Sequence, residues 1–186
     1  MLNPLLALII IVSVSDEFSF LTYRQSILSG LTKTQFVLSK LLVSIALSFY
    51  ASILVLVFGF TVGLINTQNP SVTKIIAELQ FIPLYFLQTL AYLAFAMFLA
   101  VLLRKSALTI TIFFVYTLVI ENLLRFFIQH PVRDYFPARI ISRLVPMPDH
   151  LQQVADSVPP TNVVVAVGYI LVFWGLSQIV LIRREV

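Results

Sequence analysis

Long apolar runs constrain how this chain can fold more than any other feature of its sequence. A helix needs about 20 apolar residues to cross about 30 Å of hydrocarbon. Four runs meet that length, and they cover residues 41–65, 79–103, 107–127 and 163–182. The sequence therefore predicts an all-α polytopic membrane protein, with residues 1–186 forming a single transmembrane domain.

A fifth run, residues 2–14, is shorter than a span. Its 13 residues cover only about 20 Å as a helix. No Lys or Arg precedes the run, and the acidic pair Asp16–Glu17 follows it, which argues against a signal peptide. We interpret it as the end of an incomplete span. The expectation is a helical bundle of five visible spans, with a further helix before Met1 giving six spans in the native chain.

Composition excludes several classes of protein. With 60% apolar and 11% charged residues, a chain of this size cannot hide its apolar surface in a water-soluble domain. It has no cysteine, which rules out disulfides and thiolate metal sites. The net charge is +4, but the basic residues stand singly at the ends of apolar runs. That spacing suits membrane topology and argues against a nucleic-acid partner.

Charge placement predicts the orientation in the membrane. If residues 15–40 are cytoplasmic, most basic residues on that side lie close to span ends. They are Arg24, Lys33, Lys40, Arg104, Lys105, Arg183 and Arg184. Basic residues on the other side are diluted through longer loops and matched by acids. The positive-inside rule therefore favours a cytoplasmic C-terminus, and we expect an integral protein of a bacterial cytoplasmic membrane.

The longest loop, residues 128–161, is predicted to lie on the outer face and holds six of the nine prolines. Apolar residues alternate with arginines over residues 133–145, and Asp149 could cap a second short helix that ends at Val154. We expect a pair of short interfacial or re-entrant helices before the last span. An irregular proline-rich loop is the alternative.

Residues 15–40 form an amphipathic, acidic-then-basic segment between the first two apolar runs. A helix that starts at Asp16 would place Phe20, Ile27, Leu28 and Leu31 near one stripe. Gly30 offers a break, so a turn over residues 30–34 is predicted to return the chain to the bilayer. The segment is either a docking helix for a soluble partner or an ordinary helix on the membrane surface.

The segment also carries a pattern of residue types. Glu17 follows a span, residues 22–24 and 27–30 come next, and Thr32-Lys33 and Ser39-Lys40 open the following span. This pattern resembles the first cytoplasmic loop of type-2 ABC exporter permeases (ABC-2 type). In that family the loop forms a coupling helix that docks in a cleft of the ATP-binding subunit, and short outer-face helices precede the sixth span.

The resemblance covers the chain in span order if a helix precedes Met1. It implies that the chain is the permease subunit of an ATP-binding-cassette transporter, an exporter that works as a dimer with a second permease copy or a paralogue. Two ATPase subunits would bind ATP and Mg and push on the coupling helix. The coupling residues implied are Glu17, Thr22, Tyr23, Arg24, Gln25, Ile27, Leu28 and Gly30.

Several catalytic patterns are missing from the sequence. No Gly-Lys dipeptide occurs, so the chain has no P-loop and is not expected to hydrolyse ATP itself. The only histidines, His130 and His150, lack metal-site spacing, and Asp149–His150 has no accompanying nucleophile. We therefore predict no catalytic residues, no metal site and no cofactor in this chain. A secondary transporter or another polytopic protein not driven by ATP is the alternative.

Two features within the spans call for an explanation. Small residues recur along one helix: Ser44, Ser48, Ser52, Gly59 and Gly63. Such a stripe permits close helix packing, either inside one protomer or at a subunit interface or substrate path. Glu121 and Arg125 lie four residues apart and should form an intramembrane ion pair, with a place on a transport path as the alternative.

Overall fold

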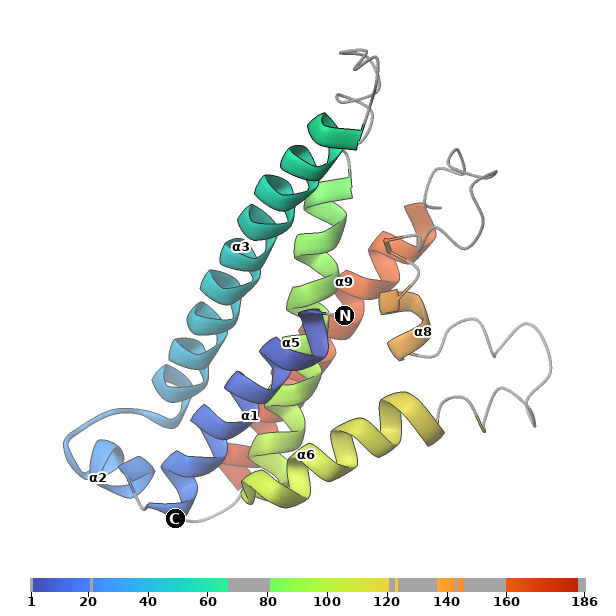
Figure 1. Ribbon diagram of the computed structural model, residues 1–186. Helices are drawn as coiled ribbons and strands as arrows, with labels where there is room; N and C mark the ends of the chain where they lie inside the picture. The colour runs from blue at the N-terminus through green and yellow to red at the C-terminus, as the bar shows by residue number, and fades with distance from the viewer. Residues whose placement is uncertain are drawn as a thin grey trace.

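The computed structural model describes residues 2–20, 22–66, 81–120, 123, 137–142, 144–145 and 160–183. The described residues are almost entirely helical (Figure 1). The helices are α1 (Leu2–Ser19), α2 (Thr22–Leu28), α3 (Lys33–Asn66), α5 (Phe81–Leu103), α6 (Ser106–Val115), the π-helical turn η1 (Tyr116–Ile120), α8 (Pro137–Ser142) and α9 (Pro160–Arg183). This order confirms the all-α prediction for the described part of the chain.

Three of these helices are long and apolar enough to cross a membrane: Lys33–Thr61 within α3, and the whole of α5 and of α9. A fourth span results if α1 and α2, which are bent by 69° at a short break, are counted together. Helices suit these segments because each peptide group finds its hydrogen-bond partner within its own helix, where lipid offers none. The chain is an integral membrane protein.

The prediction of five or six spans stays a prediction. The run predicted over residues 107–127 appears as α6 and η1, an apolar helix of Ser106–Ile120. Most of its remaining residues lie outside the described ranges. Elsewhere the predicted spans correspond to α3, α5 and α9 within a few residues, except that α3 begins eight residues earlier than the predicted span at residue 41.

Helix α5 lies at the centre of the bundle, in contact with α1, α3, α6, α8 and α9. Of its most apolar 18-residue window, 61% is buried, against 22% for α3 and for α9. Small residues permit these close contacts, and Ala91, Ala94, Ala96 and Ala100 are all buried. Phe95 adds ring contacts, at 5.0 Å to Tyr116 and 5.1 Å to Phe173 between ring centroids.

The turn between α2 and α3 is built from two local motifs. Leu31 N–H donates to the Ser26 carbonyl and Gly30 N–H to the Ile27 carbonyl, both at 3.0 Å, which is a Schellman motif. Gly30 has φ of +101° there, a conformation that favours glycine. Thr32 and Gln35 then form a capping box, each side chain accepting a hydrogen bond from the other residue's backbone N–H. The predicted break at Gly30 is confirmed.

The apolar stripe predicted on this segment is wrong. The prediction assumed one helix from Asp16 onward, but α1 continues to Ser19 and α2 begins anew at Thr22. The bend changes the helical phase, so Phe20 and Leu28 are exposed, by 73% and 87%. Tyr23 is buried in their place.

Helix α8 lies near the end of the bundle opposite α2, within the loop predicted to carry short helices. Ile140 and Leu144 are buried in a cluster with Ala166 of α9, and Leu84 of α5 packs against it. This confirms a short helix in residues 133–145. The second one, predicted from Asp149, lies outside the described residues.

The Gly30 turn leads to a test of stability. We expect Gly30→Ala to lower the free energy of unfolding by about 1 kcal/mol, because an L-residue is strained at this φ. A Cβ at Gly30 would meet no atom within 4 Å, so the cost would come from the backbone alone. Gly168→Ala is the matched control, since it also has open space but a helical backbone in α9. Unfolding of the two variants in detergent measures the difference, and equal stabilities would contradict the assignment.

Candidate functional site

The candidate site is the end of the bundle that carries α2, called the α2 end below. Four segments meet there: the C-terminal part of α1, the start of α3, the hairpin between α5 and α6, and the last turn of α9 (Figure 1). These segments are far apart in sequence. Side-chain contacts between them hold the α2 end together.

Three rings form the centre of the α2 end. Phe18 of α1, Tyr23 of α2 and Phe36 of α3 make up this aromatic triad. Their ring centroids lie 4.9 Å apart for Phe18–Tyr23, 4.8 Å for Tyr23–Phe36 and 5.9 Å for Phe18–Phe36. Tilted and edge-on pairs of this kind stabilise by roughly 0.5–1.5 kcal/mol each beyond their buried area. The triad therefore fixes α2 against both neighbouring helices.

Tyr23 is the member that α2 contributes, and it is only 4% exposed. Its hydroxyl has no hydrogen-bond partner among the described residues. Burial raises the pKa of this phenol, and the nearby Arg104 charge offsets part of that rise. Tyr23 thus acts as a neutral, mainly apolar anchor.

A buried ion pair joins α1 to α3 beside the triad. Lys40 is 7% exposed, and its Nζ lies 2.5 Å from Oε1 of Glu17. The same ammonium donates to Ser13 Oγ at 3.1 Å and lies 5.8 Å from the centre of the Phe36 ring. A buried ammonium is costly unless it is paired, so Glu17 and Lys40 depend on each other.

Two further contacts extend these links to the other helices. The Arg104 guanidinium of the α5–α6 hairpin lies 4.9 Å from the centre of the Phe18 ring, a cation–π distance. Arg104 has φ of 55°, which turns the chain between α5 and α6. Lys33 Nζ donates to the Ile182 carbonyl in the last turn of α9 at 3.3 Å, where helix carbonyls lack partners of their own. All four segments are thereby connected.

The predicted coupling residues fall into two groups. The exposed ones are Thr22, Arg24, Gln25, Leu28 and Gly30. The others face the bundle: Tyr23 is buried, Ile27 is half-buried against the core, and Glu17 pairs with Lys40. Helix α2 thus has an anchoring face and an outward face, and a soluble partner could reach only the outward one.

The stripe of small residues on α3 also divides into a buried part and an exposed part. Ser44, Ser48 and Ser52 are buried, and each hydroxyl donates to the carbonyl four residues earlier, at 2.8–2.9 Å. They pack inside the protomer. Gly59 is exposed, and a Cβ there would meet no atom within 4 Å. Gly63 lies in α3, but its surroundings are outside the described residues, as are Glu121 and Arg125.

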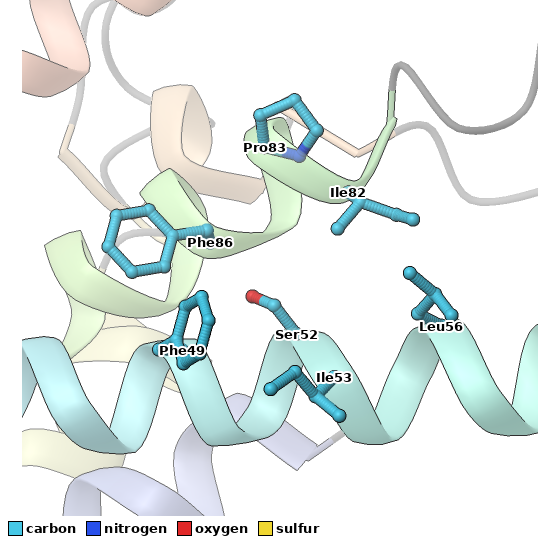
Figure 2. A pocket seen from close by; sticks show the side chains of 7 residues that line it. All are labelled: Phe49, Ser52, Ile53, Leu56, Ile82, Pro83 and Phe86. Carbon is cyan, nitrogen blue, oxygen red and sulfur yellow. The ribbon is translucent and has the colours of Figure 1, made fainter.

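An apolar cleft of about 490 Å³ lies between α3 and α5. Its lining comes from Phe49, Ser52, Ile53 and Leu56 of α3 and from Ile82, Pro83 and Phe86 of α5, which face each other across the gap in Figure 2. Ser52 is the one lining residue with a polar side chain. Among the described residues, no group of three His, Asp or Glu side chains could hold a metal ion.

Sequence reasoning missed the contacts that hold the α2 end together. It used Glu17 and Lys40 as parts of a pattern but did not pair them, and it did not single out Phe18 or Phe36. The signal was present, since Glu17 and Lys40 carry opposite charges near the facing ends of two helices joined by a short segment. The T-x-x-Q pattern of the capping box at Thr32 was also readable.

The ion pair predicts non-additive effects on stability. We expect Glu17→Gln and Lys40→Met together to destabilise less than the sum of the single changes, with a coupling free energy of about 1–2 kcal/mol. Each single change leaves one charge without its partner. Unfolding of the four proteins in detergent measures this coupling. The control cycle combines Glu17→Gln with Arg24→Gln on the exposed face, where additivity within about 0.5 kcal/mol is expected. Additivity in both cycles would disprove the pairing.

The small residues predict a contrast between two leucine substitutions. Ser48→Leu adds volume to a buried site and should lower the free energy of unfolding by about 1–3 kcal/mol. Gly59→Leu enters open space and should leave that free energy unchanged or raised. Unfolding measurements report the stability of each variant. Loss of self-association in Gly59→Leu alone would favour a subunit interface at this position.

Comparison with known proteins places the chain in one family. The family model described as "Protein of unknown function (DUF2705)" matches residues 1–186. No curated protein and no solved structure matches the chain. Because the family match spans all the residues of the sequence, the chain belongs to the DUF2705 family of proteins of unknown function.

Proposed function

We propose that the protein is the permease subunit of an ATP-binding-cassette transporter, an exporter that receives work from separate ATPase subunits through α2. One observation carries the proposal. A short helix lies between two membrane helices with one face anchored in the aromatic triad and the other exposed. The outward face carries Arg24 and Gln25 beside Leu28, so it offers a charge, an amide and an apolar side chain to a soluble partner.

The contacts at the α2 end supply a mechanical route. A force on α2 would reach α3 through Tyr23 and Phe36 and α1 through Tyr23 and Phe18. Rings in contact at about 5 Å resist compression because packed interiors have little free volume. The force would therefore move the membrane helices instead of being absorbed by the loop.

The charges at the α2 end are consistent with a cytoplasmic location. Arg24, Lys105 and Arg183 are exposed there, as the positive-inside rule prefers on the cytoplasmic side. Arg24 is the exposed charge of α2, and an acidic cleft in a soluble partner would complement it. In this proposal two ATPase subunits bind ATP and Mg, and a second permease copy or a paralogue completes the transport path.

Affinity purification from native membranes in mild detergent tests the proposal. The tagged protein should retain a soluble ATP-binding-cassette ATPase, identified by mass spectrometry, together with ATP hydrolysis. Arg24→Glu should reduce the retained ATPase by about tenfold or more, the loss expected when a contact of 1.4 kcal/mol or more is removed. Membrane insertion should be unchanged because Arg24 is exposed.

Lys105→Glu is the matched control, since it reverses an exposed charge at the same end but on the α5–α6 hairpin. It should retain the ATPase. Equal losses in both variants would show that general charge, rather than the outward face of α2, attracts the partner. Proton- or sodium-driven flux in reconstituted vesicles with no ATPase retained would replace the proposal with a secondary transporter.

A further inference from the structure

The two ends of α3 differ in how firmly they are held. At the α2 end, α3 is attached by three contacts. Lys33 donates a hydrogen bond to α9, Phe36 contacts Tyr23 of α2, and Lys40 pairs with Glu17 of α1. Toward the opposite end, residues 55–61 are all exposed, which is about two full helical turns. Among the described residues of α3, this stretch is therefore the one least covered by protein.

Along α3, the change from buried to exposed residues occurs beside the α3–α5 cleft. Ser44, Ala51 and Ser52 are buried, but Ile53 and Leu56 are exposed and line the cleft. In Figure 2 the Leu56 side chain points toward Ile82 at the start of α5. The cleft therefore marks where α3 separates from α5.

The segment just before the cleft is suited to bending. Ser44, Ser48 and Ser52 each bond the carbonyl four residues earlier in the same helix. Such back-bonding hydroxyls compete with the backbone N–H for the same carbonyl, and they often bend helices. Three of them in successive turns place the weakest backbone of α3 between its held end and its free end.

We propose that α3 is a lever that stays fixed at the α2 end, bends over residues 44–52 and closes the α3–α5 cleft at the opposite end. The opposite end has room to move, because the cleft of about 490 Å³ lies between Leu56 of α3 and Ile82 of α5. The held end does not, because an ion pair, a cation–π contact and the aromatic triad oppose its movement. The lever is a property of this chain alone and stands whether or not an ATPase drives it.

Spin-label distances test the lever directly, and the absence of native cysteine allows labels at chosen positions. The outer pair is Phe58→Cys with Pro83→Cys, and the inner control pair is Leu38→Cys with Lys105→Cys. All four positions are exposed, and each pair joins α3 to α5 or its hairpin. Phe58 lies about 15 Å beyond Ser48 along the helix, so a bend of about 20° there displaces the outer label by about 5 Å and the inner one hardly at all.

We expect the outer distances in lipid nanodiscs to spread over about 5 Å more than the inner distances. Outer and inner distributions of equal width would overturn the proposal. A second variant tests the held end: Glu17→Gln with Lys40→Met should widen the inner distribution, because it removes the charges that tie α1 to α3. An inner distribution that stays as narrow as before would show that the ion pair does not fix the α2 end of α3. If that variant fails to fold, the two label pairs alone decide whether α3 moves as a lever.

Discussion

Hydrocarbon provides no hydrogen-bond partner, so a polar group in these helices is costly unless it finds a partner within the protein. The backbone meets this requirement by forming α-helices. Several hydroxyls also find a hydrogen-bond acceptor within their own helix. Ser48, Thr109 and Ser177 are buried, and each donates to a carbonyl four residues earlier. Because these groups need no partner from another helix, the helices can pack through alanines and aromatic rings, as α5 does at the centre.

Charges obey the same constraint with less freedom, because no backbone carbonyl can neutralise an ammonium. Lys40 is buried, so its position depends on Glu17 and brings the end of α1 to the start of α3. Arg104 and Lys33 attach the α5–α6 hairpin and the end of α9 to the same region. Among the described residues, the charged contacts between helices thus gather at the α2 end, whereas a neutral hydrogen bond joins Thr89 of α5 to Asn3 at the start of α1. The difference between the two ends of α3 is the basis of both proposals: α2 as the helix that receives force, and α3 as the helix whose far end moves.

Two long helices and the break between α2 and α3 could be predicted from sequence, because they depend on local composition. The spans of α5 and α9 follow from the length of apolar runs, and the break at Gly30 follows from the one glycine in its segment. The apolar stripe through Phe20 and Leu28 failed because a helix period holds only while the helix is unbroken, and nothing local marks the 69° bend. The burial of Tyr23 could not be predicted for a related reason, since it depends on Phe18 and Phe36 from two other helices.

The amino-acid sequence by itself determined the class of protein, its helical spans and the turn that returns the chain to the bilayer. Each of these depends on hydrophobicity or backbone preference within one segment. Only the tertiary structure decided which face of α2 points outward, which charges pair and where α3 leaves α5. These depend on the relative angles of helices, which are set by packing between residues distant in sequence.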